Sequence, residues 1–165
     1  MTTLSPAQVE AFRRDGTIAV EDAVTPQQLA ALRREFDAWW EESRAHERNY
    51  GEMIDGRPRF DLQIPGHSRA HPLLRRVNSP TEISEAYLDV VANSRIPDMV
   101  ADLVGPNVKF HHSKINAKLP GANTEVKWHQ DFPFTPHSND DLVTALLAMD
   151  DVDENNGPLI SALGS

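Results

Sequence analysis

The sequence of 165 residues contains no cysteine. Disulfide bonds and thiolate metal sites are therefore excluded, and any metal ion must be held by histidine, carboxylate or carbonyl ligands. The sequence also lacks a run approaching the roughly 20 apolar residues of a membrane-spanning helix. Residues 1–11 lack the basic start and the apolar run of a signal peptide. We therefore expect a cytoplasmic protein that acts without a membrane.

Cationic residues are the minority, with 16 Lys and Arg against 25 Asp and Glu and a net charge of −9. Nucleic-acid binding needs clustered Lys and Arg to neutralise phosphates, so the composition argues against a nucleic-acid partner. An anionic ligand held by one or two local cations is still compatible with this charge. The hydrophobic content of 39% is typical of a globular protein, and the length fits one domain, residues 1–165. The sequence does not indicate an oligomeric state.

One pattern marks three helix starts: a hydroxyl residue, then proline, then Gln or Glu at the third helical position. This is a capping box with proline in the first turn. The pattern occurs at residues 5–8, 25–28 and 79–82. It predicts helices over about 6–15, 26–44 and 80–104, the last one interrupted near 93–97 and ended by Gly105. Trp39 and Trp40 fall on an apolar face of the second helix, which favours a core position over a cofactor-stacking role.

Residues 48–78 are rich in Gly and Pro and predict an irregular covering loop, whereas residues 17–20 predict a short strand. Two histidines, His67 and His71, lie four positions apart in this loop. A helix could bring them onto one face, but Pro65, Gly66 and Pro72 disfavour a helix here. We interpret both histidines as solvent-exposed.

From residue 107 the hydrophobic period changes to two, and residues 108–119 predict a long strand. One face of this strand is apolar at its start and then polar at four successive places, His112, Lys114, Asn116 and Lys118. Such a face is either the wall of a ligand cavity or a solvated outer surface. Further strands are predicted over 142–149 and, after the Asn155-Asn156-Gly157 turn, over 158–163.

His129 and Asp131 are two positions apart in a stretch that reads as extended. In a strand their imidazole and carboxylate would point to the same side. Those groups are two of the three ligands of a facial Fe(II) triad. The triplet by itself has a second interpretation, a surface aspartate beside a half-buried histidine, because the chain has 7 His and many Asp and the spacing arises by chance.

Several further motifs favour the iron-ligand interpretation of His129 and Asp131 over the surface interpretation. They are the opening Leu4-Ser5-Pro6 through Phe12, Trp128-His129-Gln130-Asp131, the loop over 136–142 and Asn156-Gly157-Pro158-Leu159. With helices first and the His-x-Asp stretch later, the sequence resembles the phytanoyl-CoA dioxygenase family of Fe(II)/2-oxoglutarate oxygenases over most of its length. The resemblance implies a mainly β fold with flanking α-helices, a double-stranded β-helix of the jelly-roll or cupin-like kind. Helices would occupy about 5–105 and the first jelly-roll strands about 107–165.

The same resemblance implies an incomplete fold in this chain. In the family, the second iron-binding histidine and the arginine that clamps 2-oxoglutarate follow the Asn-Gly-Pro-Leu hairpin at a distance, and this sequence stops at Ser165. We therefore expect the 165 residues to be the N-terminal part of a longer protein.

The resemblance also assigns roles to individual residues. It implies that His129 and Asp131 bind Fe(II), and that Asn116 contacts 2-oxoglutarate. Lys114 is expected to hold a carboxylate of the cosubstrate or a substrate anion. His112 and Phe134 are expected to contact the substrate. Weaker candidates are Lys118, His137, His111 and Tyr50.

The activity implied is hydroxylation of an unactivated C–H bond of a small organic substrate. It consumes O2 and decarboxylates 2-oxoglutarate to succinate. Halogenating relatives replace the aspartate with a small residue, so Asp131 favours hydroxylation. The alternative is a non-catalytic or cupin-type metal-binding module that lacks a complete triad. The sequence does not name the substrate.

Overall fold

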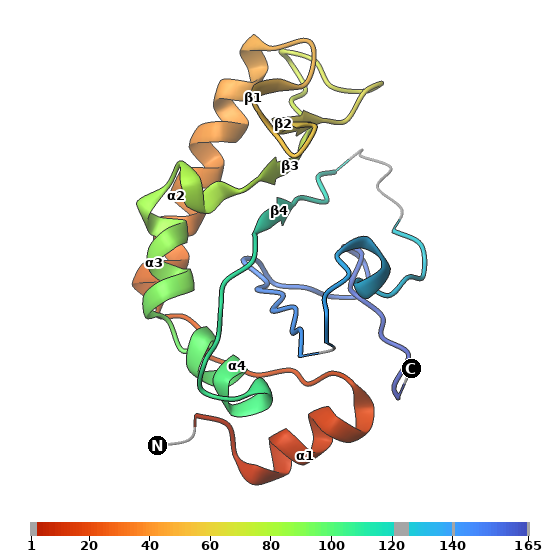
Figure 1. The fold of residues 1–165 in the computed structure, drawn as a ribbon. Coiled ribbons are helices and arrows are strands. Elements are labelled where there is room, and N and C mark those ends of the chain that lie inside the picture. Colours follow the sequence, from red (N-terminus) through yellow and green to blue (C-terminus); the bar gives the residue numbers. More distant parts are fainter. Residues whose placement is uncertain (1–2, 121–125, 140, 165) are drawn as a thin grey trace. The chain divides into compact units, whose positions relative to one another are not determined.

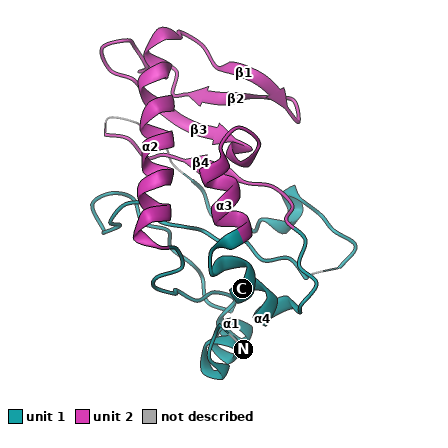
Figure 2. Cartoon of the chain, turned by 90° about the vertical axis from the view of Figure 1, so that its left-hand side faces the viewer, with its two compact units in different colours: residues 1–24, 93–109, 125–165 teal, residues 25–92, 110–124 magenta. Residues whose placement is uncertain are grey.

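The computed structural model describes residues 3–120, 126–139 and 141–164. It divides into two compact units (Figure 2). Unit 1 comprises residues 1–24, 93–109 and 125–165, and unit 2 comprises residues 25–92 and 110–124. Among the described residues, no helix has both the length and the apolar character to span a membrane.

Unit 1 contains α1 (Pro6–Asp15) and α4 (Ile96–Val104), seen in red and green in Figure 1. The start of α1 is the predicted capping box, in which the Ser5 hydroxyl accepts from the Gln8 backbone N–H and Gln8 Oε1 accepts from the Ser5 N–H at 2.9 Å. Helix α1 ends at Gly16, which has a φ of 75°. Asp102 of α4 accepts hydrogen bonds from the backbone N–H groups of Thr3 at 2.6 Å and Leu4 at 2.7 Å. This carboxylate ties the start of the chain to α4.

Unit 2 pairs two helices with an antiparallel sheet. Helix α2 (Pro26–Glu42) begins with the predicted capping box at Thr25, and α3 spans Glu85–Asn93. The sheet has the order β1-β2-β3-β4, with β1 (Tyr50–Ile54), β2 (Arg57–Leu62), β3 (Leu74–Asn78) and β4 (Lys114–Asn116). Each strand therefore pairs with the next one along the chain.

The core of unit 2 lies on one face of this sheet. Phe60 of β2 stands opposite Val77 of β3, and Val77 stands opposite Ile115 of β4. All three are buried. The Trp39 ring of α2 contacts the Phe60 ring at a centroid distance of 6.1 Å and stacks on Tyr87 of α3 at 5.5 Å. Trp39 is therefore a core residue, as its helical spacing predicts.

The prediction of an irregular loop over 48–78 is wrong, because that stretch contains β1, β2 and β3. Gly51 lies within β1, and Gly56 lies in the turn between β1 and β2. Asp55 and Gly56 have φ values of 48° and 78°, which is the geometry of a tight hairpin turn between β1 and β2. Gly51 has a φ of 86°, and a Cβ there would come within 2.9 Å of the Phe60 ring. Gly51 is thus required by the close approach of β2.

The predicted capping box at Ser79 is also wrong. Ser79 adopts a left-handed conformation with a φ of 48°, its side chain makes no cap hydrogen bond, and only a 3₁₀ turn, Pro80–Glu82, follows it. The Ser79 N–H donates instead to the Ser113 carbonyl at 3.0 Å, which continues the β3–β4 pairing. The helix itself begins at Glu85, and the predicted interruption separates α3 from α4. Gly105 ends α4 as predicted.

Most of the strands predicted outside residues 48–78 are absent from the described residues. Of residues 108–119, only Lys114–Asn116 is a strand, and residues 17–20, 142–149 and 158–163 form none. A strand needs a partner for its backbone hydrogen bonds, and the described part of the chain offers these segments no partner. A turn lies at residues 154–155, with the Asn156 N–H donating to Asp153 O at 3.4 Å, but no described strands flank it, so the predicted hairpin at Asn155-Asn156-Gly157 is not observed. The described fold is accordingly mixed, with four α-helices and a four-stranded antiparallel sheet.

Candidate functional site

His129 and Asp131 lie together in unit 1. The Nε2 atom of His129 is 3.3 Å from Oδ1 of Asp131. The segment is not a strand, and Asp131 immediately precedes a 3₁₀ turn, Phe132–Phe134. The two side chains are therefore brought together by a local turn and not by strand alternation.

A backbone carbonyl contacts the other ring nitrogen of His129 and selects the tautomer of the neutral ring. Nδ1 of His129 is 2.7 Å from the carbonyl oxygen of Lys127. A carbonyl only accepts, so Nδ1 carries the proton and Nε2 of the neutral ring presents a lone pair. Histidines that bind metals commonly donate their other N–H to a backbone carbonyl in this way.

The facing atoms fit a divalent cation. In the neutral form of the ring, Nε2 and the Asp131 carboxylate are both acceptors, and no proton lies between them. Adjacent ligands of an octahedral ion with bonds of about 2.1 Å lie about 3.0 Å apart. The observed separation of 3.3 Å is close to that value. The nitrogen and oxygen donors are also of the kind that non-haem Fe(II) takes.

Thr144 and Phe134 complete the described surroundings of the pair. The Thr144 hydroxyl donates to Oδ2 of Asp131 at 3.0 Å, which leaves Oδ1 turned towards His129. The Phe134 ring lies edge-on to the imidazole at a centroid distance of 5.7 Å and is 74% exposed. Thr144 was not expected from the sequence, because nothing in its spacing relates it to Asp131.

The pair is open to solvent, with side-chain exposures of 41% for His129 and 48% for Asp131. Within the described ranges, no group of three His, Asp or Glu side chains is placed to hold a metal ion. The described residues therefore bring two candidate ligands together, His129 and Asp131.

Asn116, Lys114 and His112 lie in unit 2. Asn116 and Lys114 occupy alternate positions of β4, on either side of the buried Ile115, and so share one face of the sheet as predicted. Asn116 stands opposite Arg76 of β3, whose Nε donates to Asn116 Oδ1 at 3.0 Å. His112 precedes β4, and its Nδ1 is 2.6 Å from Nδ1 of His111.

Arg76 is a residue that the sequence did not single out. It lies in the stretch interpreted as a loop, so its place on a strand beside Asn116 was hidden. The sequence does carry a signal for a strand here, because the apolar Leu74 and Val77 flank the Arg75-Arg76 pair. That spacing fits a strand with one extra residue, a β-bulge.

His67 and the weaker candidate Tyr50 have structural roles in unit 2. His67 is half-buried, contrary to the prediction of exposure: its Nδ1 accepts from the Leu73 N–H at 2.9 Å and its Nε2 is 3.0 Å from His46 O. His71 is exposed as predicted. Tyr50 stacks between the rings of His46 and Phe60 at 3.6 and 4.6 Å. Burial, followed by the charge of Glu42, raises the pKa of the Tyr50 hydroxyl, so this group stays neutral at physiological pH.

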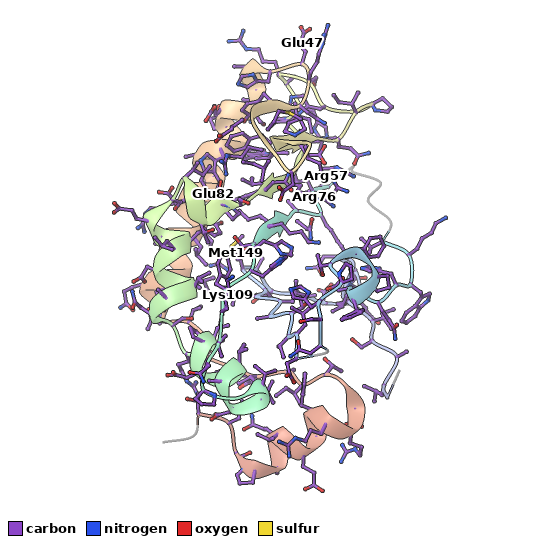
Figure 3. The ribbon with its side chains drawn as sticks, in the orientation of Figure 1. Glu47, Arg57, Arg76, Glu82, Lys109 and Met149 are labelled. Atoms are coloured by element: carbon purple, nitrogen blue, oxygen red, sulfur yellow. The ribbon has the colours of Figure 1, made fainter. Side chains whose placement is uncertain are left out.

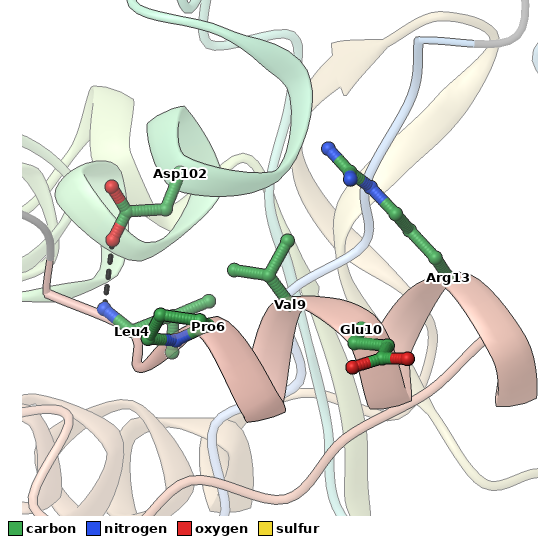
Figure 4. Close-up of a pocket in the computed structure, with 6 residues that line it drawn as sticks. All are labelled: Leu4, Pro6, Val9, Glu10, Arg13 and Asp102. Atoms are coloured by element: carbon green, nitrogen blue, oxygen red, sulfur yellow. Dashed lines mark hydrogen bonds between the residues drawn. The ribbon is translucent and has the colours of Figure 1, made fainter.

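A cavity of about 380 Å³ lies beside α1 and α4 (Figure 4). Its lining contains none of the predicted site residues. Its lining includes two carboxylates, Glu10 and Asp102. The Asp102 carboxylate already accepts hydrogen bonds from the Thr3 and Leu4 N–H groups. We therefore regard this cavity as part of the packing between the chain start and α4. It is lined by Leu4, Pro6, Val9, Glu10, Arg13 and Asp102.

The sequence model of the phytanoyl-CoA dioxygenase (PhyH) family matches residues 12–165. The chain belongs to the phytanoyl-CoA dioxygenase family. Among curated relatives, a probable alpha-ketoglutarate-dependent hypophosphite dioxygenase of Stutzerimonas stutzeri is 40% identical over 93 residues, which cover 56% of this chain and 32% of that protein. The ectoine dioxygenase of Streptomyces coelicolor is 26% identical and covers 98% of this chain and 51% of that protein. That of Halomonas elongata is also 26% identical, over 98% of this chain and 46% of that protein.

This phytanoyl-CoA dioxygenase family chain thus spans about half the length of the ectoine dioxygenases it matches, and about a third of the hypophosphite enzyme. The recognition of the family from the motifs is confirmed. The matched region contains His129 and Asp131, while the roles of individual site residues stay predictions.

Proposed function

We propose that the protein is an Fe(II)/2-oxoglutarate-dependent dioxygenase that hydroxylates a small organic substrate. Family membership implies both Fe(II) and 2-oxoglutarate, and relatives are named as dioxygenases, one of them alpha-ketoglutarate-dependent. The observation that carries the proposal is the His129–Asp131 pair, in which an imidazole nitrogen and a carboxylate oxygen face each other at 3.3 Å. Substrate, cosubstrate and O2 are the small-molecule partners of this reaction.

His129 and Asp131 hold the iron in this proposal. The Lys127 carbonyl keeps the proton on Nδ1 of His129, which leaves Nε2 available as a ligand. The Thr144 hydroxyl holds Oδ2 of Asp131, so that the carboxylate binds through Oδ1. Bound Fe(II) supplies the oxidative chemistry, in which O2 and 2-oxoglutarate are converted to succinate and CO2 as the substrate is hydroxylated.

Asn116 and Lys114 are proposed to bind 2-oxoglutarate. The Asn116 carboxamide oxygen is occupied by Arg76, so its NH2 group is the part that can donate to a carboxylate. Lys114 presents a cation two positions away on the same face of β4. His112 and the exposed Phe134 are proposed to contact the substrate.

The full fold in this proposal is a double-stranded β-helix. Support comes from the family and from the large apolar side chains that residues 126–164 expose, such as Trp128 and Leu159 at 71% and 68%. Such side chains are buried when strands close into a jelly roll. The two kinds of relative are named for different substrates, ectoine and hypophosphite. The proposal therefore specifies the substrate only as a small molecule.

One observation favours a second function. Among the described residues, His129 and Asp131 are candidate metal ligands and no third candidate lies with them, an arrangement that a non-catalytic or cupin-type metal-binding module would also have. Such a module would bind a divalent cation without 2-oxoglutarate turnover.

Succinate release tests the two functions. The wild-type protein supplied with Fe(II), O2 and 2-oxoglutarate should release succinate, and the His129→Ala and Asp131→Ala variants should lose at least about 100-fold, in line with removal of a ligand that is essential to the metal's chemistry. Asp151→Ala is the matched control, because that exposed side chain belongs to the same segment and lies outside the site. Undiminished succinate release by Asp131→Ala would contradict the assignment, and metal binding without any turnover would favour the module.

A further inference from the structure

The chain leaves β3 through a strained corner at Ser79. This residue has a φ of 48° and a ψ of 53°, a left-handed conformation that residues other than glycine seldom adopt. It is followed directly by the 3₁₀ turn Pro80–Glu82. Backbone strain of this kind persists only where the surrounding structure enforces it, and such residues gather at functional sites. The contacts of Ser79 therefore bear on what this part of unit 2 does.

A buried arginine of β2 enforces the conformation of this corner. Arg59 is 3% exposed, and its Nη1 donates to two successive backbone carbonyls, those of Asn78 at 3.2 Å and Ser79 at 2.9 Å. Its Nη2 donates to Glu52 at 3.0 Å and to Glu82 at 2.8 Å. Glu82 ends the 3₁₀ turn, which follows β3 in the green part of the ribbon (Figure 3). Arg59 therefore holds the corner at its start and at its end.

The burial of Arg59 is not explained by stability alone. Removing a guanidinium from water is unfavourable, and a buried ion pair often stabilises a protein no more than an apolar side chain of similar size does. The partner carboxylates of Glu52 and Glu82 are 73% and 55% exposed, so only the cation is buried. The four N–H groups of its two terminal nitrogens meet four acceptors, which leaves none of them for a ligand. We therefore interpret Arg59 as a residue that fixes backbone geometry.

The corner in turn holds the residue before β4. The Ser79 N–H donates to the Ser113 carbonyl at 3.0 Å, and the hydroxyls of Thr81 and Ser113 are 3.3 Å apart. Ser113 lies directly between His112 and Lys114 in the sequence. Because successive residues of an extended chain point to opposite sides, the place of Ser113 decides where its two neighbours point. Those neighbours are residues that we propose to contact the substrate and 2-oxoglutarate.

We propose that Arg59 is a positioning residue for the ligand-binding segment, residues 112–116. It holds Ser79 in the left-handed conformation, and the corner then sets the place of Ser113 and the direction of the side chains on either side of it. Arg59 itself contacts no ligand. The use of the segment for 2-oxoglutarate and substrate rests on the proposed function, whereas the hold of Arg59 on the segment does not.

Succinate release by the full protein at varied 2-oxoglutarate concentration tests the proposal. Arg59→Lys keeps the charge but loses the planar fork, so it cannot meet all four acceptors. It should raise the KM for 2-oxoglutarate at least about tenfold, because misplacing a binding group by about 1 Å costs up to about 100-fold. The kcat should change less than about twofold, as expected when ground-state binding is lost. Arg44→Lys is the matched control and should leave KM unchanged, since Arg44 also contacts a carboxylate, Glu41, and a backbone carbonyl, that of Arg69, outside the corner.

A second substitution separates positioning from general stability. Glycine adopts a positive φ without strain, so adding Ser79→Gly to Arg59→Lys should return KM to within about threefold of wild type. Glycine replaces none of the ion pairs of Arg59, so a defect caused only by their loss would not be restored. If a thermal melt shows that Arg59→Lys does not fold, Glu82→Gln takes its place. That exposed change should raise KM about threefold, in line with the loss of one exposed partner.

Amide hydrogen exchange over residues 112–117 gives a readout that needs no turnover. Exchange there should be at least about threefold faster in Arg59→Lys than in wild type or Arg44→Lys, and slow again in the double variant. Either an unchanged KM or an unchanged exchange rate in Arg59→Lys would overturn the proposal, as would a raised KM that Ser79→Gly does not restore. If the wild-type protein releases no succinate, the proposed function fails, and the exchange rates alone decide whether Arg59 positions the segment.

Discussion

The sheet of unit 2 and the segment over residues 126–164 differ in how they are held. Leu32, Leu74 and Val77 are at most 1% exposed and anchor the helices on the sheet. In the segment, Trp128 and Leu146 are 71% and 69% exposed, and its described residues form no strand. The segment makes local hydrogen bonds such as those of Asn156 to Asp151 and Asp153, and its Gly164 N–H donates to the Asp15 carbonyl at 2.9 Å. Stability therefore resides in the sheet unit, while the candidate iron ligands lie where packing is poorest.

The largest difference is expected from matched truncations of two leucines. Leu74→Ala should lower the free energy of unfolding by about 2–5 kcal/mol, because a fully buried side chain leaves a cavity. Leu146→Ala should change it by less than about 0.5 kcal/mol, since that side chain already contacts water. Urea unfolding of the 165-residue chain measures both values. Equal effects would show that residues 126–164 pack as tightly as the sheet.

The next largest effect is expected from Thr144, which contacts the His129–Asp131 pair. Thr144→Val removes the hydroxyl that orients Asp131, and loss of such an outer partner weakens metal affinity by about 10–100-fold. Thr135→Val is the control, because the Thr135 hydroxyl approaches only the backbone oxygen of Asp131, at 3.5 Å. Metal titration of both variants measures the difference. Identical affinities would mean that Thr144 does not position the carboxylate.

A smaller effect concerns Tyr87 in the packed unit. Burial raises the pKa of Tyr87, whose hydroxyl donates to the Leu32 carbonyl at 3.1 Å. The unfolded tyrosine ionises near pH 10 while the folded one stays neutral, so stability is full below pH 10 and is lost as the pH rises further. Tyr87→Phe should lower stability by about 1 kcal/mol at pH 7 and reduce this alkaline loss. Unfolding curves at pH 7 and above pH 10 test it, and parallel losses in both proteins would contradict the prediction.

The smallest effect compares two helix starts of similar sequence. Thr25→Ala should lower the free energy of unfolding by about 1 kcal/mol, because the Thr25 hydroxyl accepts the Gln28 N–H at 3.1 Å. Ser79→Ala should change it by less than about 0.5 kcal/mol, since Ser79 makes no cap hydrogen bond. Thermal melts of both variants measure the difference. An equal decrease in melting temperature would mean that Ser79 caps its helix as Thr25 does.

Local chemistry explains what the sequence could predict. The capping boxes at Ser5 and Thr25 depend on residues three positions apart, and both form. His129 and Asp131 are two positions apart, so almost any extended or turn geometry lets their side chains meet, and they do so at 3.3 Å. Trp39 lies in the core because helical periodicity places it on the apolar face.

Features that depend on distant partners could not be predicted. Ser79 has the same local pattern as Thr25, but its N–H pairs with Ser113, its backbone is left-handed, and its hydroxyl makes no cap bond. Arg76 meets Asn116 only through β3–β4 register, across 40 positions of sequence. The Gly-rich stretch over residues 48–78 was interpreted as a loop because glycine is equally common in loops and in tight hairpin turns. Thr144 reaches Asp131 through a fold of the chain that has no sequence signature.

The most direct measurement is an anaerobic Fe(II) titration of the wild-type protein beside the His129→Ala, Asp131→Ala and Asp151→Ala variants. Wild type and Asp151→Ala should bind one equivalent with the same affinity, and each of the other two variants should bind at least tenfold more weakly. If all four proteins bind Fe(II) alike, or if none binds it, His129 and Asp131 are not iron ligands and their proximity is a surface contact.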